Sequence, residues 1–467
     1  MTQLTLGKLC ESTGGTLLAP AIMTTTVSDT AIGRVVIDSR DVQVGDVFWA
    51  LPGKHQDGAR FAADAYQRGA SGVVAANWYC VPPLDCWAVQ VDDPRAALWS
   101  AAVCKRETFS GRVIAVTGSV GKSTTRHMIH TVLASAAPGT ESPKNYNNHI
   151  GLPLSVLGLR EEDRWAVFEM GLSACGEIRR LAGLCRPEVG VVTSAADAHL
   201  GALGGKGNSI HEKTGWLDLL PAEGLAVLAC DDDNLRRAAI SCRAAVTWVG
   251  RRGDCDVYPS HVSYGGGNLR FRVQGQPFRL RVWGRQHLTA ALSALVVGRW
   301  MGLDDQSIAR ALAGHEPLPM RCEVAYVQGV TIVNDAYSAT PAATRAALDL
   351  LREVDVPGRR IVVCGDLREL GTDSAKLHRE IGEAVVTRCG ADFLVACGEH
   401  AEEVVRGALA AGMHATQTFD CRTPREAAHR VRGLVASGDA VLVKGSRALR
   451  MERVVEGLRA TPLRRAA

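Results

Sequence analysis

The chain has 467 residues, of which 46% are hydrophobic and 22% charged, and its 53 basic and 49 acidic side chains leave a net charge of +4. This is the composition of an ordinary globular enzyme, long enough for about three domains of roughly 150 residues each. The charge is too dispersed for a nucleic-acid-binding face, and no apolar run approaches the roughly 20 residues that cross a bilayer. With no secretory signal at the start, a cytoplasmic monomer without membrane insertion is expected.

Short strand-like runs open the chain, at 35–37, 47–50, 72–75 and 87–91, with a helical stretch at 60–68. Turns separate these runs. They predict a small α/β domain over residues 1–110.

From residue 112 the pattern changes to buried strand, loop and helix. Apolar runs at 113–116, 166–168 and 189–193 predict strands, and the stretch 123–134 carries apolar residues on one helical face. A parallel sheet covered by helices is the natural packing for such runs. Residues 244–283 alternate apolar and polar around a triple-glycine turn, which predicts an antiparallel patch. The central domain is therefore expected over 111–314.

Two prolines at 317 and 319 break the chain, and the strand–helix rhythm resumes at 361–364, 393–396 and 440–443. This predicts a third, Rossmann-like domain over 315–467. The fold class is then α/β with three domains, the middle one being a parallel-sheet, P-loop-type domain.

Fourteen cysteines are present, and none is spaced as Cys-x-x-Cys. Several stand inside apolar runs, such as Cys364 and Cys397. We expect them to be small buried apolar side chains rather than disulfide partners or zinc ligands.

A glycine loop stands between the strand at 113–116 and the helix at 123–134, and it is predicted to bind ATP phosphates. Backbone N–H groups and a helix N-terminus can surround phosphate oxygens there, with Lys122 neutralising the outer phosphates and Ser123 binding Mg²⁺. The usual P-loop pattern requires glycine five positions before Gly121, where this chain has Val116, so the loop is a shorter variant. Its residues are Thr117, Gly118, Ser119, Val120, Gly121, Lys122 and Ser123.

A second group consists of Glu169 at the end of a buried strand, His199 just past another, and Lys213. Ligands of open α/β sheets bind at the carboxyl ends of strands, so Glu169 is a candidate for a second Mg²⁺. Taken singly, each residue has a plainer interpretation: a surface acid, a loop histidine and a solvated lysine.

These motifs together resemble the Mur ligases over nearly the whole chain. In the first domain, Asp38-Ser39-Arg40 and the glycine-containing segment 45–58 look like the family's uridine-nucleotide-binding pattern. The short glycine loop matches, and the asparagine-rich segment 145–153 carries Asn145, Asn147 and Asn148. The resemblance assigns magnesium binding to Glu169 and His199, and it identifies Lys213 as the family's carbamylated lysine.

In the third domain, the segments 365–371 and 443–447 are similar to the branch of the family that adds D-alanyl-D-alanine. The Asp-Asn-Pro-Arg motif usual in the diaminopimelate- or lysine-adding branch is absent. The resemblance places His287, Arg321, Asp335 and Asp366 at the nucleotide. It places residues nearer the substrates as follows: Ser39, Arg40, Asn145, Asn147, Asn148, Lys444, Ser446 and Arg447.

The chain departs from the family pattern around adenine and ribose. The usual Asp-x-Tyr-Asn-Ala-Asn-Pro has Ser338 and Thr340 in place of its asparagines, and the usual His-Asn pair is Gln286-His287. A later asparagine of the helix that follows is Ala290. Two other departures lie elsewhere: Gly201 replaces a glutamate that often follows the histidine motif, and Gly215 replaces an acid two positions past Lys213. We therefore expect this chain to differ from other members of the family in the affinity or the orientation of the bound nucleotide.

The resemblance implies an ATP-dependent ligase that joins D-alanyl-D-alanine to UDP-N-acetylmuramoyl-tripeptide through an acyl phosphate, with ATP and two Mg²⁺ ions as cofactors. Either diaminopimelate or lysine fits as the third residue of the tripeptide. Two alternatives remain: a ligase of the same family adding another amino acid, and a catalytically impaired homologue that binds nucleotide or precursor.

Overall fold

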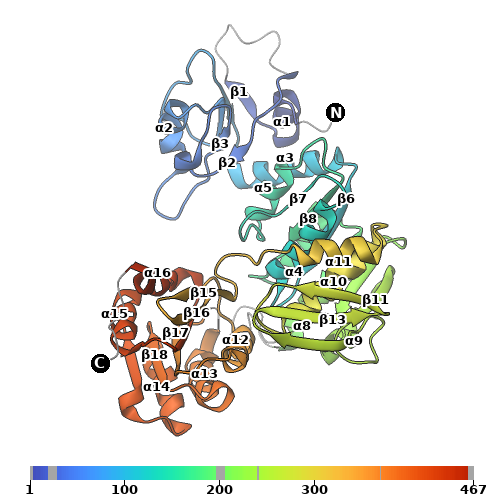
Figure 1. Cartoon of the computed structure of the whole chain (residues 1–467). Coiled ribbons are helices and arrows are strands. Elements are labelled where there is room, and N and C mark those ends of the chain that lie inside the picture. The colour runs from blue at the N-terminus through green and yellow to red at the C-terminus, as the bar shows by residue number, and fades with distance from the viewer. Residues whose placement is uncertain (1–3, 19–28, 196–205, 239–240, 369, 461–467) are drawn as a thin grey trace.

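The structure is a computed structural model that describes residues 4–18, 29–195, 206–238, 241–368 and 370–460, with the backbone alone for 206–209 and 237–238. It is mixed α/β, as predicted, and Figure 1 shows three bodies in chain order, coloured blue, cyan to yellow, and orange to red. In the described residues, no helix is both long and apolar enough to span a membrane.

The N-terminal body is a five-stranded sheet in the order β1-β5-β4-β3-β2, in which β1 alone is antiparallel to its neighbour. Its helix α3 (Pro94–Glu107), capped by Asp93, packs between this body and the next. The sequence patterns had not indicated α3. The other elements are α1 (Leu6–Thr13), β1 (Thr16–Leu18), β2 (Val35–Val36), β3 (Val47–Trp49), α2 (Ala62–Gln67), β4 (Gly72–Ala75) and β5 (Trp87–Gln90).

The central body is a six-stranded parallel sheet in the order β11-β10-β9-β6-β8-β7. Apolar cores cover both faces, since Ile114 and Val116 of β6 belong to one core while Val113 and Ala115 belong to the other. This explains why its strands are apolar runs without alternation. Its strands are β6 (Arg112–Thr117), β7 (Gly139–Glu141), β8 (Trp165–Glu169), β9 (Val189–Val192), β10 (Leu225–Ala229) and β11 (Ala245–Val249).

The predicted antiparallel patch is smaller than expected. β11 pairs parallel with β10 in the central sheet, and the antiparallel sheet begins only at β12 (Ser260–Gly265), followed by β13 (Asn268–Val273) and β14 (Gln276–Leu280). Alternating polarity cannot tell an edge strand of a parallel sheet from a hairpin strand, because both expose one face. The helices of this body are α4 (Lys122–Ala134), α5 (Gly151–Leu157), α6 (Glu177–Cys185), α8 (Lys206–Thr214), α9 (Asp233–Ala238), α10 (His287–Trp300) and α11 (Asp305–Ala313).

The C-terminal body is a six-stranded sheet in the order β15-β16-β20-β17-β18-β19, parallel except for the β15–β16 hairpin. Apolar cores again cover both faces. Its elements are β15 (Glu323–Val327), β16 (Val330–Asp335), α12 (Pro341–Glu353), β17 (Arg360–Gly365), α13 (Ser374–Cys389), β18 (Phe393–Cys397), α14 (Ala401–Ala410), β19 (Thr418–Cys421), α15 (Pro424–Leu434), β20 (Ala440–Lys444) and α16 (Glu452–Ala460).

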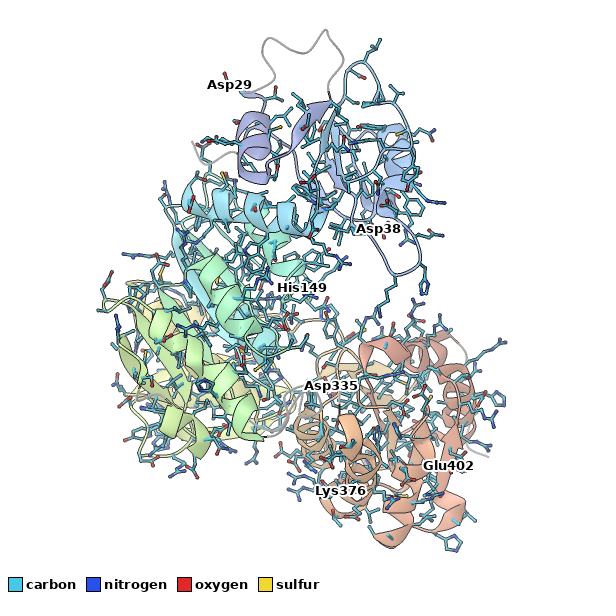
Figure 2. All side chains as sticks on the ribbon, turned by 180° about the vertical axis from the view of Figure 1, so that it is seen from behind. Asp29, Asp38, His149, Asp335, Lys376 and Glu402 are labelled. Carbon is cyan, nitrogen blue, oxygen red and sulfur yellow. A yellow bond between two sulfur atoms is a disulfide. The ribbon has the colours of Figure 1, made fainter. Side chains whose placement is uncertain are left out.

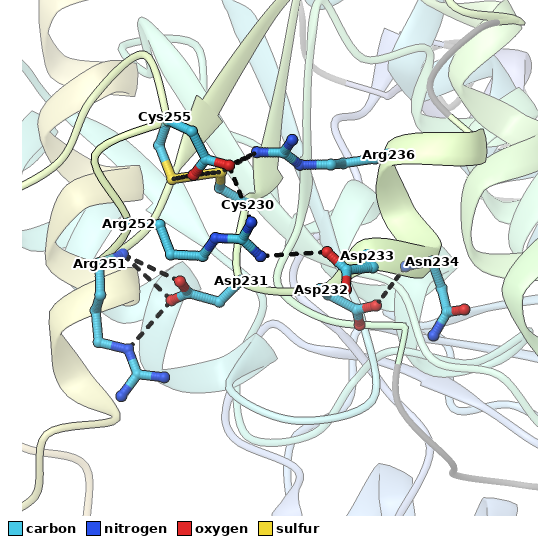
Figure 3. Close-up of polar contacts among 10 residues, drawn as sticks. Cys230, Asp231, Asp232, Asp233, Asn234, Arg236, Arg251, Arg252 and Cys255 are labelled. Carbon is cyan, nitrogen blue, oxygen red and sulfur yellow. Dashed lines mark hydrogen bonds and ion pairs between the residues drawn. A yellow bond between two sulfur atoms is a disulfide. The ribbon is translucent and has the colours of Figure 1, made fainter.

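The expectation for the cysteines is wrong at one place, because Cys230 and Cys255 form a disulfide across 25 residues of sequence. Cys230 follows β10 and Cys255 follows β11, and the pairing of these two strands brings the thiols together. Figure 3 shows Arg236 beside the pair, with Nη2 3.0 Å from Cys230 Sγ and 2.9 Å from the Asp254 carboxylate. Elsewhere the expectation is confirmed for five buried free thiols: Cys185, Cys364, Cys389, Cys397 and Cys421.

His315, where the chain leaves the central body, makes stability depend on pH. It is buried against Thr131, and burial together with the nearby His127 and His287 lowers the pKa of its imidazole to about 3. The unfolded chain binds a proton there below about pH 6.5 while the folded chain does not, so stability falls as pH drops from 6.5 towards 3. We expect the melting temperature of His315→Gln to fall less between pH 7.5 and pH 5 than the melting temperature of the unmodified chain does. Equal losses in a thermal-melt series would contradict this assignment.

Candidate active site

The glycine loop joins β6 to α4, and the adjoining end of β9 holds its shape. Gly118 has φ +138°, and a Cβ there would lie 2.2 Å from Thr193 Oγ1, so only glycine fits. Thr193 Oγ1 donates to the Val120 carbonyl at 2.6 Å, and Ser194 accepts from Val120 N at 3.0 Å. Val116, where the usual pattern has glycine, is a buried core residue of β6. The loop is therefore short because the strand continues one residue further.

Glu169, at the end of β8, lies against the first turn of α4. Ser123 Oγ donates to its Oε2 at 2.5 Å, and Asn147 Nδ2 donates to its Oε1 at 2.8 Å. Burial raises the pKa of Glu169, but Lys122, Arg126 and Arg321 outweigh it together with the Ser123 hydrogen bond, so the pKa lies below its usual range. Glu169 is thus a buried carboxylate that stays ionised at neutral pH.

Arg126 and the end of β9 belong to this site but were missed in the sequence. The Arg126 guanidinium, one turn beyond Ser123 on α4, lies 3.7 Å from Glu169 and 2.9 Å from Glu141. A single basic residue on a helix gives no signal of such a role. Thr193 and Ser194 could have been found, because polar residues at the carboxyl end of a parallel strand commonly contact ligands.

The donor set at this site fits a hard divalent cation. A hydroxyl and a carboxylate oxygen converge between Ser123 and Glu169, and oxygen ligands are those that Mg²⁺ prefers. His199, the third predicted ligand, lies outside the described residues. Lys213, the fourth, is buried at the end of α8, where its carbonyl accepts a hydrogen bond from Trp216 Nε1 at 2.8 Å.

Arg321 brings the C-terminal body to the glycine loop. Its Nη2 donates to Ser123 Oγ at 2.8 Å although the two residues are 198 apart in sequence. The guanidinium also lies over the Tyr337 ring, 4.3 Å from its centre. The contact places a third positive charge beside Lys122 and Arg126.

We expect Arg321→Ala to lower kcat/KM for ATP roughly 10- to 100-fold, the equivalent of about 1.5–3 kcal/mol for a hydrogen bond to a charged group. Arg321→Lys keeps the charge but loses the planar stack on Tyr337, and we expect it to be intermediate. Steady-state phosphate release measures both. A wild-type rate in Arg321→Ala would remove this contact from the working site.

Asp335 and Lys444 had been placed at different substrates, but the structure pairs them. They lie side by side at the ends of β16 and β20, with Lys444 Nζ 2.5 Å from Asp335 Oδ2 and 2.9 Å from the Ser338 carbonyl. Figure 2 shows Asp335 on the side of the C-terminal body towards the central body. Lys444 is buried, and in this structure its positive charge neutralises the Asp335 carboxylate.

The residues that depart from the family pattern have local roles here. Thr340 caps α12 by accepting from Ala343 N at 3.2 Å, and Gln286 Nε2 lies 3.2 Å from Cys322 Sγ. His287 is buried, and burial lowers the pKa of its imidazole to about 4, so it is neutral. Within the described part of the chain its Nδ1 has no hydrogen-bond partner.

Asp366 and the residues around it lie at the ends of β17 and β20. The Asp366 carboxylate accepts from the N–H groups of Glu399 and His400, at 2.9 and 3.0 Å, and Ser446 N donates to the Asp366 backbone carbonyl at 3.1 Å. The Ser446 hydroxyl is buried without a hydrogen-bond partner among the described residues, and Arg447 pairs with Glu452.

The remaining candidates are Ser39 and Arg40 in the N-terminal body, and the asparagines of segment 145–153 in the central body. Arg40 is exposed and pairs with Asp38 at 2.5 Å, beside the buried Ser39. Asn148 Oδ1 accepts from the N–H of Gly151, the first residue of α5, at 2.9 Å, whereas Asn147 Nδ2 donates to Glu169. Asn145 is exposed. Of the asparagine-rich segment, only Asn147 joins the Glu169 group through a side-chain hydrogen bond that the structure defines.

Comparison with known proteins gives the same family over the same parts of the chain. Residues 116–298 match the Mur ligase middle domain and residues 320–447 match the Mur ligase, glutamate ligase domain. The UDP-N-acetylmuramoyl-tripeptide–D-alanyl-D-alanine ligase of Bacillus subtilis is 30% identical over 99% of this chain and 100% of its own length. The enzyme of that name from Escherichia coli is 28% identical over 98% and 99%.

Comparison with solved structures indicates the same family. MurF from Acinetobacter baumannii superposes with a TM-score of 0.85 at 26% identity, covering 98% of this chain and 99% of its own. MurF ligase from Thermotoga maritima, in complex with ADP, gives 0.77 at 28% identity, covering 92% and 97%. With a glycine loop, a buried glutamate and a C-terminal arginine meeting in one place, and with relatives matched from end to end, the chain belongs to the Mur ligase family.

Proposed function

We propose that this chain is an ATP-dependent ligase that joins D-alanyl-D-alanine to the terminal carboxylate of UDP-N-acetylmuramoyl-tripeptide in peptidoglycan precursor synthesis. The observation that supports this most directly is the meeting of Ser123, Glu169 and Arg321, which come from the glycine loop, the end of β8 and the C-terminal body. Such a meeting suits phosphoryl transfer, in which positioning and charge stabilisation provide most of the catalysis.

The chemistry requires activation, because a carboxylate will not release oxide to an amine at neutral pH. The carboxylate of the peptide attacks the γ-phosphorus of ATP, ADP departs, and an acyl phosphate forms. The amine of D-alanyl-D-alanine then attacks the acyl carbon, loses a proton, and phosphate departs. Lys122 and Arg321 stabilise the negative charge that develops on the transferring group.

Magnesium, when bound, would supply further charge neutralisation on the phosphate oxygens. We assign its ligands to Ser123, Glu169, His199 and a carbamylated Lys213. Carbamylation turns a cation into an anion that can bind Mg²⁺, and it would remove the cost of burying the positive charge of Lys213, which is 1% exposed. Asn147 orients Glu169 by donating to its Oε1 at 2.8 Å.

The three predicted domains take separate roles in this proposal. Residues 1–110 bind the uridine nucleotide through Ser39 and Arg40, residues 111–314 bind ATP, and residues 315–467 close over it. The adenine nucleotide is contacted by Arg321, Asp335, Asp366 and His287. The incoming dipeptide lies nearer Lys444, Ser446 and Arg447.

Phosphate release from ATP, measured with defined muramoyl-tripeptides and a panel of amines, tests the proposal. We expect turnover to require both the tripeptide and D-alanyl-D-alanine, with product of the corresponding mass. Stimulation by a single amino acid instead would identify a ligase of different specificity. ATP binding without turnover on any amine would indicate an impaired homologue.

A further inference from the structure

A cavity of about 510 Å³ lies on the central body away from the glycine loop, between the β12–β14 sheet and α11. Figure 1 shows both elements in the green-to-yellow part of the chain. Its polar lining consists of four arginines, one histidine and two glutamines: Arg270, Arg272, Arg279, Arg310, His261, Gln276 and Gln306. No aspartate or glutamate of the described residues lines it.

The strands place three of these arginines on one face. In β13 and β14 the apolar residues point into the core, and Arg270, Arg272 and Arg279 alternate with them on the exposed side. Arg270 lies directly opposite Arg279 in the antiparallel register. Like charges facing each other across two strands destabilise a sheet, so this arrangement costs stability unless an anion neutralises it.

The four arginines have no carboxylate partner within the described chain. Arg279 donates twice to the Asn268 amide oxygen, at 3.0 and 2.9 Å, and Arg310 donates to Ser307 Oγ at 3.0 Å. The neighbouring Arg299, by contrast, forms a two-bonded pair with Asp305 at 2.7 Å.

The volume of the cavity and the spacing of its arginine side chains indicate the chemical class of the ligand. Pockets for small molecules measure roughly 300–1,000 Å³, and guanidinium groups bind phosphate through paired hydrogen bonds. Neighbouring arginines on the sheet face are separated by roughly 5–7 Å at Cβ, along or across the strands, which suits two joined phosphates better than one. The stacked rings of Phe271 and Phe278, 5.3 Å apart, are buried on the core face of the same strands, so the polar side chains, and not these rings, would contact the ligand.

We propose that this cavity is a second anion site, distinct from the glycine loop, which binds a small molecule bearing a pyrophosphate group. The site does not depend on the ligase reaction. It would be present whichever amine the protein uses.

Calorimetric titration of the Lys122→Ala variant with inorganic pyrophosphate tests the proposal, because this variant lacks the lysine charge of the glycine loop. No ADP is added, since ADP itself carries two joined phosphates and would compete for the cavity. We expect one site that binds pyrophosphate at least tenfold more tightly than orthophosphate, and whose affinity falls as salt is raised. Arg270→Gln/Arg279→Gln should weaken it at least tenfold. Arg422→Gln/Arg425→Gln, which removes the same charge from exposed positions on the C-terminal body, should leave it unchanged.

Several results would overturn the proposal: no pyrophosphate binding by Lys122→Ala, unchanged affinity when the cavity substitutions are added to it, or an equal loss when the control substitutions are added instead. Arginine-dependent binding to phosphatidylglycerol vesicles without pyrophosphate binding would point to a membrane surface instead. The cavity variant should melt no lower than the unmodified chain, since it relieves repulsion. If it does melt lower, Arg310→Gln on α11 gives the same test without altering the sheet.

Discussion

Lys122→Ala is expected to lower kcat/KM for ATP about 10²–10³-fold, because Lys122 provides a positive charge where the phosphoryl group is transferred. In this structure Lys122 Nζ donates to the Gly118 carbonyl at 2.7 Å, so the lysine folds over its own loop. Its charge also helps to keep Glu169 ionised. Truncation to alanine therefore removes the positive charge that would contact the phosphate, and it also removes part of the stabilisation of the ionised form of Glu169.

Phosphate release under saturating tripeptide and dipeptide measures this effect. Lys376→Ala, an exposed lysine on α13, is the matched control and should behave like the unmodified enzyme. Lys122→Arg should recover little, because the broader guanidinium does not fit a closely packed glycine loop. Unchanged phosphate release in Lys122→Ala would remove the loop from the mechanism.

Lys213→Ala is expected to abolish turnover, with partial recovery in formate or acetate. Lys213 is 1% exposed at the end of α8. If it is carbamylated, its removal deletes an anionic oxygen ligand, and a small carboxylate can enter the space left behind. A lysine with a purely structural role would give no recovery with added carboxylate.

Lys213→Met is the matched control for packing, since it keeps most of the side-chain volume but cannot carry carbon dioxide. We expect it to melt close to the unmodified chain, to be inactive, and to be rescued less than Lys213→Ala because no space is free. Activity in either variant without added carboxylate would contradict the carbamate assignment.

Much of the local structure could be predicted because it depends on neighbouring residues. The apolar run ending at Val116, the glycines at 118 and 121 and the amphipathic stretch that follows specify strand, loop and helix within about twenty residues. Glu169 was recognisable because it ends a buried run. Helix α3 was missed, although Asp93 followed by Pro94 is a common helix start.

The errors arose where the outcome depends on distant partners. The alternation at 245–249 is compatible with either kind of sheet, and only the pairing of β11 with β10 made it a parallel edge strand. The same pairing brought Cys230 and Cys255 together, which their spacing alone did not indicate. Strand order is set by packing between segments, so it leaves little trace in any one of them.

For this protein, the sequence by itself determined the phosphate loop, the acidic residue beside it and the family, because each rests on a short motif with its own backbone requirement. The tertiary structure alone decided that Arg321 reaches Ser123, that Arg126 joins Glu169 to Glu141, and that Lys444 neutralises Asp335. These contacts join segments up to 198 residues apart. Arg126, Glu169 and Lys444 are buried, and an unpaired buried charge is too costly to keep, so each forms an ion pair once the sheets are assembled.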